Sequence, residues 1–357
     1  MKPGTLVIRA DANEAMGTGH VMRCLALAQA WRREDGAVVF AMAESTAAIT
    51  ARLEREDFSI TTMGCRAGGF EDANALASLA AELDAAWIAV DGYHFSPTYP
   101  RVLKEAGFRL LWIDDTGRCS PYSTDVILNQ NLYAVSGMYR NMAKDTTLLL
   151  GPEYVLLRKE FLAWQSWRRD FAARAKKLLV AMGGSDSQNV TAQVLRALAQ
   201  SEFEIEVTVV VGGSNPHERA IQQLALELPG QTSIRTDVSD VTELMAGADL
   251  AISAAGVTCY ELALLQVPMI LLTLAENQVP TAAAFAECGA AVNLGNPECG
   301  VERIAETVHR LALDDQFRRS LGKKARSLVD GKGASRVCHA LLRIAQNEST
   351  SVELLRT

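Results

Sequence analysis

The residues best suited to chemistry form the turn at 16–20, with the sequence Met-Gly-Thr-Gly-His. An apolar run at 6–11 predicts a β-strand before this turn, and apolar residues at helical spacing over 21–31 predict a helix after it. Such a glycine-rich turn directs free backbone N–H groups and the positive end of the helix dipole toward its occupant. An anion is the expected guest, with His20 beside it. The alternative is an ordinary strand–helix turn that carries a histidine.

Two common nucleotide-binding motifs do not fit this turn. A dinucleotide-binding fingerprint needs a third glycine where Met22 stands, three residues after Gly19. A phosphate-binding P-loop needs Lys and then Ser or Thr after the glycine, whereas His20 and Val21 follow here. The turn therefore predicts an anion site of another kind.

Composition narrows the class of protein. A chain of 357 residues exceeds one comfortable core and predicts two domains. The net charge of −7 gives no support to nucleic-acid binding. Seven cysteines without a CxxC pair favour reduced thiols over disulfides or a zinc site, and the five histidines never fall at metal-ligand spacing. With no signal peptide or membrane-spanning run, we expect a soluble, cytoplasmic protein without metal or cofactor.

Polar residues gather where predicted strands of the first half end. Short apolar runs alternate with helical stretches, which predicts parallel strands covered on both faces. Asp91, Asp114 and Asp115 each follow such a run, at the sheet edge where open α/β folds bind ligands. Taken one at a time, each of these carboxylates is equally compatible with a turn or a helix cap.

The second half repeats this design. A strand beginning at 177 runs into Gly183, Gly184 and Ser185, and another precedes the turn 256–258. Glu261, in the helix that follows, either compensates the helix dipole or binds ribose hydroxyls. The fold class expected is therefore α/β, with two Rossmann-like domains facing across a cleft. The predicted boundaries are 1–151 for the N-terminal domain, 152–176 for the connection and 177–357 for the C-terminal domain.

In combination, these segments resemble the pseudaminic acid biosynthesis UDP-sugar hydrolases. That family removes UDP from UDP-2,4-diacetamido-2,4,6-trideoxy-β-L-altropyranose and is related to the B-type glycosyltransferases that act on lipid I. Arg9-Ala10-Asp11, the turn 16–20 and Arg23 resemble its Arg-x-Asp … Gly-x-Gly-His-x-x-Arg signature. Where the family has Asp-His-Tyr-Gly, this chain has Asp91-Gly92-Tyr93-His94, so His94 inherits no role. Further similar segments lie at 128–131, 156–161, 182–186, 214–216, 252–258 with Glu261, and 275–278.

The resemblance implies a GT-B-like fold and a catalytic role for His20 as general base. Water would attack the anomeric carbon with C–O cleavage and inversion. The helix dipole favours neutral imidazole, which suits this role. Asp11 would orient His20 or the sugar. The implied substrate-binding residues are Asp11, Gly17, Gly19, Arg23, Arg158, Asn277 and Gln278, and the implied nucleotide-binding residues are Gly183, Gly184, Ser185, Gly256, Val257, Thr258 and Glu261.

Two other functions stay open at this point. A sugar transferase of the same fold would deliver the sugar to an acceptor; such enzymes commonly present an apolar or basic membrane-facing patch, and only the connection, with Trp164 and Trp167, could hide one. A nucleotide-sugar binding protein would have no need of His20. The expected partner is a small UDP-sugar, with no nucleic acid or membrane, in a pathway that serves flagellin glycosylation or surface polysaccharide. The oligomeric state is left open, a monomer being one option.

Overall fold

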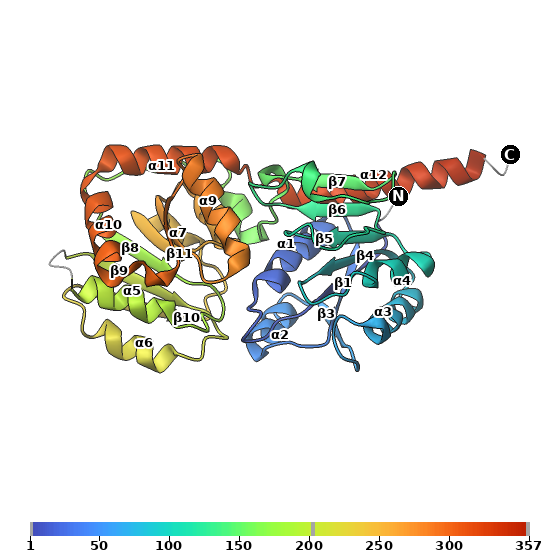
Figure 1. Ribbon diagram of the computed structural model, residues 1–357, viewed down its shortest axis with the longest axis horizontal. Coiled ribbons are helices and arrows are strands. Elements are labelled where there is room, and N and C mark those ends of the chain that lie inside the picture. The colour runs from blue at the N-terminus through green and yellow to red at the C-terminus, as the bar shows by residue number, and fades with distance from the viewer. Residues whose placement is uncertain (1–2, 201–203, 355–357) are drawn as a thin grey trace.

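Two α/β domains, each built on a parallel sheet, lie side by side in the computed structural model, which describes residues 3–200 and 204–354 (Figure 1). Each domain has one sheet with helices on both of its faces, so the predicted fold class is confirmed. None of the helices in the described ranges combines the length and the apolar character that a membrane span requires.

The first sheet has the strand order β3-β2-β1-β4-β5-β6-β7, with every neighbouring pair parallel. The chain builds outward from β1 in one direction and returns to β4 to build in the other. The carboxyl ends of β1 and β4 therefore form a topological switch point, where such sheets bind ligands. The bounds are β1 Thr5–Ala10, α1 Gly19–Arg33, β2 Ala37–Met42, α2 Ala47–Glu54, β3 Ser59–Thr62, α3 Phe70–Glu82, β4 Ala85–Asp91, α4 Tyr99–Glu105, β5 Leu110–Ile113, β6 Val126–Asn129, η1 Ser136–Met138 and β7 Thr147–Leu150.

The second sheet repeats this plan with the order β10-β9-β8-β11-β12-β13, again all parallel. Its switch point lies between β8 and β11. The bounds are β8 Lys177–Ala181, α5 Val190–Ala199, β9 Glu206–Val211, α6 Glu218–Ala225, β10 Thr232–Thr236, α7 Thr242–Gly247, β11 Leu250–Ala254, α8 Thr258–Leu264, β12 Met269–Leu272, η4 Glu276–Gln278, α9 Val279–Glu287, β13 Val292–Gly295, η5 Pro297–Cys299, α10 Val301–Leu313 and α11 Asp315–Leu328.

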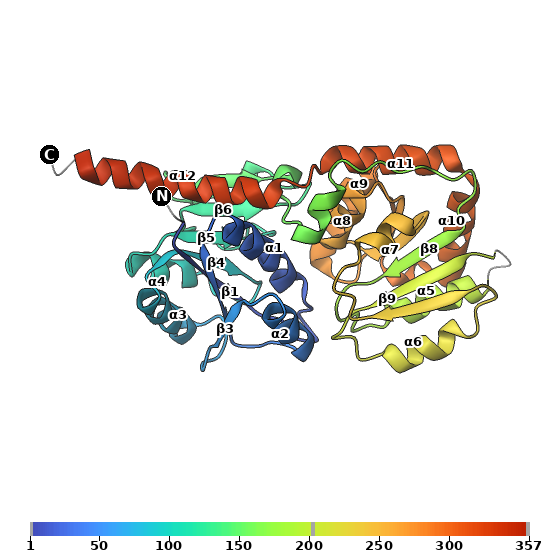
Figure 2. The same ribbon diagram turned by 180° about the vertical axis from the view of Figure 1, so that it is seen from behind.

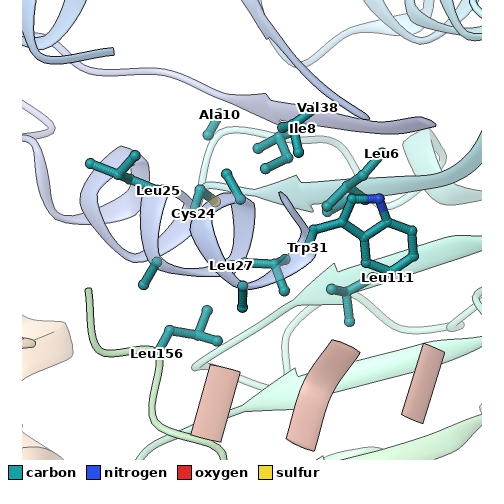
Figure 3. Packing of buried hydrophobic residues seen from close by; sticks show 14 of the residues in the cluster. Leu6, Ile8, Ala10, Cys24, Leu25, Leu27, Trp31, Val38, Leu111 and Leu156 are labelled. Carbon is teal, nitrogen blue, oxygen red and sulfur yellow. The ribbon is translucent and has the colours of Figure 1, made fainter. Parts of the chain in front are cut away.

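Helix α1 is packed into the core of the first domain along most of its length. Figure 3 shows Trp31 of α1 beside Leu6 of β1. Leu25 and Leu27 of α1 and Ile8 of β1 belong to the same cluster, and all five side chains are fully buried. Burying a leucine or isoleucine side chain contributes about 1.5–3 kcal/mol. The helix is thereby fixed against the sheet, and its first turn lies at the carboxyl end of β1.

The connection between the sheets contains only short 3-10 segments, η2 Pro152–Tyr154 and η3 Lys159–Trp164. Arg169 accounts for part of its path. This side chain is buried and donates to the backbone carbonyls of Met245, Ala248 and Leu265. These bonds attach the connection to the second domain.

The last helix, α12 at Gly333–Leu354, packs on the first domain, and both views show it running along that domain (Figures 1 and 2). Val337, Cys338 and Leu341 are buried in the same core as α1. The sequence prediction placed all of 177–357 in the C-terminal domain, and these contacts correct it for α12. An amphipathic helix needs a core to cover, and the sequence of the helix alone does not show which core that is.

Candidate active site

A cleft of about 620 Å³ lies between the two domains. It brings together all the predicted site residues except Asp11. Among the described residues, no three His, Cys, Asp or Glu side chains are arranged as metal ligands. The predicted residues that line the cleft are Gly17, Gly19, His20, Arg23, Arg158, Gly183, Gly184, Ser185, Gly256, Val257, Thr258, Glu261, Asn277 and Gln278.

His20 lies in the first turn of α1 and is paired with Asp91, the last residue of β4. Nδ1 of His20 is 2.7 Å from Oδ1 of Asp91, and the two groups meet because β1 and β4 are neighbours in the sheet. A carboxylate at Nδ1 assigns the ring proton to that nitrogen. Nε2 can then accept a proton from a molecule in the cleft. The ring of Tyr93 packs edge-on against the imidazole, with 4.7 Å between centroids.

Arg23 lies one turn further along α1 and binds two carboxylates. Its Nε and Nη2 donate to the two oxygens of Asp91 at 2.6 and 2.7 Å, and its Nη1 donates to Asp115 at 2.8 Å. Burial alone would raise the pKa of Asp91, but the positive charge of Arg23 and the contact with His20 lower it below its usual range. Asp91 is therefore ionised, and Arg23 orients it. Because these bonds direct its donors at Asp91 and Asp115, Arg23 has little left with which to bind a substrate, the role predicted for it from the sequence.

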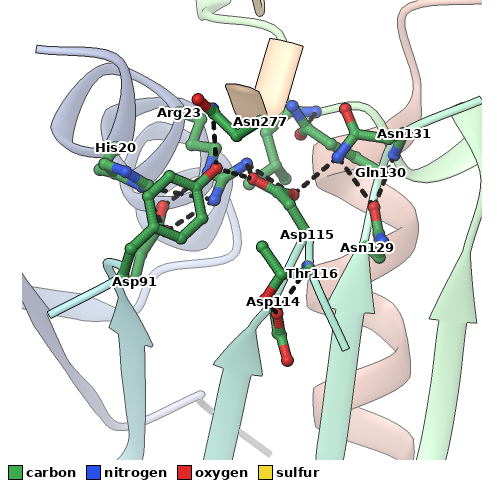
Figure 4. Close-up of polar contacts among 12 residues, drawn as sticks. His20, Arg23, Asp91, Asp114, Asp115, Thr116, Asn129, Gln130, Asn131 and Asn277 are labelled. Carbon is green, nitrogen blue, oxygen red and sulfur yellow. Dashed lines mark hydrogen bonds and ion pairs between the residues drawn. The ribbon is translucent and has the colours of Figure 1, made fainter. Parts of the chain in front are cut away.

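The hydrogen bonds continue from Arg23 to the second domain. The hydroxyl of Tyr93 donates to Asp115 at 2.8 Å and accepts a bond from Nδ2 of Asn277 at 3.2 Å. Asn131 also donates to Asp115, at 2.7 Å. Figure 4 shows the path from His20 and Asp91 through Arg23 to Asp115. The hydroxyl of Tyr93 then connects Asp115 to Asn277. The orientation of His20 is thus connected to a side chain of the opposite domain.

Asp11 does not line the cleft and does not contact His20, which corrects its predicted role. It is fully buried, and its Oδ1 accepts bonds from Arg9 at 2.6 Å and from the backbone N–H groups of Ala43 and Glu44. Its Oδ2 lies 3.0 Å from Nε2 of His94. Asp11 therefore anchors the loop after β2, and Asp91 takes the orienting role. Two signals in the sequence marked Asp91: its place at the end of a predicted strand, and its match to the Asp of the family's Asp-His-Tyr-Gly segment.

The turns predicted to bind the nucleotide lie together at the second switch point, after β8 and β11. Gly183 has a φ of +92°, in the left-handed region that favours glycine. Gly184 packs against Thr18 of the first domain so closely that an added Cβ would lie 2.0 Å from the hydroxyl oxygen. The turn 256–258 leads into α8. The N–H of Gly256 donates to the carbonyl of Ala254, whereas the N–H groups of Val257 and Thr258 have no backbone acceptor among the described residues. Backbone donors from both turns therefore line the cleft.

Glu261 and Arg158 form a buried ion pair in the cleft. Nη2 of Arg158 is 2.8 Å from Oε1 of Glu261, and Nη1 is 3.0 Å from Glu160. Burial would lower the pKa of Arg158, and the two carboxylates raise it. Because its charge is balanced twice, Arg158 orients Glu261 and is not a free cation for a diphosphate. Gln278 accepts a bond from the N–H of Leu274 at 2.8 Å and so stabilises its own loop.

Two buried carboxylates, Asp91 and Asp11, make the free energy of unfolding depend on pH. Asp91 and Asp11 both have pKa values lowered below their ordinary 3.8. The stabilisation that they contribute is complete above that ordinary value and is lost as the pH falls toward the folded values. We expect the unfolding free energy to change little from about pH 7 to 5, and to fall below about pH 4 by roughly 1.4 kcal/mol per pH unit for each extra proton bound on unfolding. Urea unfolding across this range checks the slope, and a flat profile down to about pH 3 would contradict it.

Comparisons with known proteins agree with this architecture. Residues 178–336 match the family model described as the glycosyltransferase family 28 C-terminal domain. The chain is 32% identical to the spore coat polysaccharide biosynthesis protein SpsG of Bacillus subtilis, over 67% of this chain and 70% of that protein. It is 24% identical to the UDP-2,4-diacetamido-2,4,6-trideoxy-β-L-altropyranose hydrolase of Campylobacter jejuni, over 80% of this chain and 97% of that one. MurG of Acinetobacter baumannii superposes with a TM-score of 0.68 at 16% identity, covering 95% and 99% of the two chains, which shows a GT-B fold.

Proposed function

The chain belongs to the family that contains SpsG and the UDP-2,4-diacetamido-2,4,6-trideoxy-β-L-altropyranose hydrolases, and from this membership we propose that it removes UDP from that sugar nucleotide in pseudaminic acid biosynthesis. The observation that carries the proposal is the His20–Asp91 pair at the cleft. A protein that only binds a nucleotide sugar needs no oriented imidazole. A hydrolase needs one, because water must lose a proton as it attacks.

The chemistry follows from the tautomer. Asp91 accepts the Nδ1 proton of His20, so Nε2 takes a proton from water while the water oxygen bonds to the anomeric carbon. The bond between that carbon and the UDP oxygen breaks, and its electron pair leaves with UDP. Attack from the face opposite to UDP inverts the anomeric centre. General-base assistance of this kind is worth about 10²–10⁴-fold in rate.

The second domain supplies the leaving-group site in this proposal. The N–H groups of Gly183, Gly184, Val257 and Thr258 would stabilise the growing negative charge of the diphosphate. Glu261, held by Arg158, would accept hydrogen bonds from the ribose hydroxyls. UDP leaves readily as an anion, so the site needs no second carboxylic acid of the kind that glycosidases use.

A glycosyltransferase is the second candidate, because the family model matched by residues 178–336 and the MurG structure both belong to transferases. It would use the same base and the same nucleotide site, with an acceptor hydroxyl in place of water.

Turnover in oxygen-18 water separates the two activities. The purified protein is incubated with UDP-2,4-diacetamido-2,4,6-trideoxy-β-L-altropyranose without an acceptor, and the products are followed by NMR and mass spectrometry. We expect UDP without label, and free sugar that carries the label at its anomeric carbon and has inverted configuration. Label in the UDP phosphate would indicate P–O cleavage. Release of UDP only after an acceptor extract is added would favour the transferase.

A further inference from the structure

Arg52 extends from α2 of the first domain to the part of the cleft where the nucleotide is proposed to bind, which we call the nucleotide end. Its side chain is about nine-tenths buried. Nη1 donates to the backbone carbonyl of Ser239 at 2.5 Å, and Ser239 belongs to the loop after β10 that lines the cleft. Nη2 donates to Glu160 of the connection at 2.9 Å and also contacts Glu56. A single guanidinium thus contacts both domains and the segment between them.

Glu160 passes this contact on to Glu261. Its Oε1 accepts bonds from Arg52 and from Arg158, and Arg158 binds Glu261 at 2.8 Å. We call Arg52–Glu160–Arg158–Glu261 the ion-pair chain. Its four side chains are at most one-tenth exposed, and their charges alternate and balance. The other oxygen of Glu160 has no hydrogen-bond partner among the described residues. The orientation of Glu160 therefore depends on its two arginines.

From this geometry we infer that Arg52 is a positioning residue for the nucleoside diphosphate. It fixes Glu261 through the ion-pair chain and fixes the 237–239 loop through the carbonyl of Ser239. The two sides of the nucleotide end are then already ordered before the ligand binds, which improves affinity by reducing the entropy lost on binding. This inference rests on the proposed function for the identity of the ligand. Its consequence is that nucleotide affinity depends on a side chain of the first domain.

The same contacts link nucleotide binding to the arrangement of the domains. Arg52 bonds with Ser239 only when α2 lies against the second domain. If this bond improves nucleotide affinity, then a bound nucleotide must in turn favour that arrangement, because the coupling between two equilibria is reciprocal.

The test uses UDP alone as the probe and the full chain as the protein. Isothermal titration measures the Kd of UDP for the wild type and for Arg52→Gln, and steady-state kinetics gives KM and kcat for the UDP-sugar. We expect Arg52→Gln to weaken UDP about tenfold and to raise KM similarly, with kcat little changed because Arg52 does not contact His20. Arg52→Lys, which keeps the charge but makes fewer bonds, should fall between the two.

Arg318→Gln is the matched control. Arg318 is a buried arginine of the second domain that donates to the backbone carbonyls of Ala172, Leu311 and Ala312. Its loss should lower the melting temperature without changing the Kd of UDP. If Arg52→Gln behaves in the same way, its role is only structural and the inference is wrong.

A double-mutant cycle tests the path through Glu261. If Arg52 acts through the ion-pair chain, Arg52→Gln should weaken UDP much less in a Glu261→Gln background than in the wild type. Additive losses would overturn that path. The measurement is independent of turnover: a protein that binds UDP in this pattern but releases no free sugar would contradict the hydrolase proposal and leave the role of Arg52 intact.

Discussion

Replacing His20 with glutamine is expected to lower kcat by about 10²–10⁴-fold, because the general base is lost. Glutamine is long enough to retain a hydrogen bond to Asp91, so the substitution should leave the first turn of α1 in place. The Kd of UDP should stay unchanged, since the proposed nucleotide contacts come from the second domain. Steady-state kinetics with the UDP-sugar and titration with UDP give the two numbers.

A smaller substitution at the same position provides a positive control. His20→Ala leaves space for a ring beside Asp91, and added imidazole should restore part of the lost turnover. Nearly normal kcat in His20→Gln, at normal KM, would show that the base lies elsewhere. Loss of UDP binding together with turnover would indicate instead that His20 serves the fold of the cleft.

Replacing Asp91 with asparagine is expected to have the second-largest effect on turnover. Three nitrogen donors converge on this carboxylate: Nδ1 of His20, and Nε and Nη2 of Arg23. An asparagine offers one acceptor oxygen and directs an NH₂ group at one of these donors. The orienting bond at Nδ1 and the counter-charge of Arg23 are both weakened, so we expect kcat to fall by roughly 10²–10⁴-fold, as for an orienting carboxylate in other histidine-based sites. Kinetics and thermal unfolding are measured on the same preparation.

Asp114→Asn is the matched control for this prediction. Asp114 follows β5, the strand next to β4, and Asp91 and Asp114 are both nearly fully buried. Asp114 accepts bonds from Thr116, Gly117 and the hydroxyl of Tyr122 and makes none to His20 or Arg23. Its substitution should lower the melting temperature and leave kcat close to normal. Equal losses of kcat in both variants would refute an orienting role specific to Asp91.

The positions of both predicted sites follow from one topological fact. Each sheet starts in the middle, builds outward to one side and then returns to build to the other side. Each sheet therefore has a pair of neighbouring central strands after which the chain continues in opposite directions. In the first domain that pair, β1 and β4, carries His20 and Asp91. In the second domain β8 and β11 carry the two glycine-rich turns. The domains present these edges to a common cleft, and a reacting molecule can therefore contact both.

The sequence by itself determined the local features of this protein. Continuous apolar runs specified parallel strands, because a strand buried on both faces cannot tolerate polar alternation. Glycine-rich turns between strand and helix specified where anions could bind, since their geometry depends on residues only a few positions apart. The turn at 16–20 with His20, and the turns at 183–185 and 256–258, were found in this way, and all of them line the cleft.

Only the tertiary structure decided which distant residues meet. Asp91 rather than Asp11 pairs with His20, because β4 ends beside the first turn of α1, whereas Asp11, which follows β1, turns toward the loop after β2. Helix α12 joins the core of the first domain, and Arg52 contacts the loop at Ser239. Each of these contacts joins residues that lie far apart in the chain, and a single sequence shows which side chains need partners but not which partners the packing supplies. The buried charges are the sharpest case, because a carboxylate at a strand end is equally suited to a turn, a cap or a histidine until its neighbours are fixed.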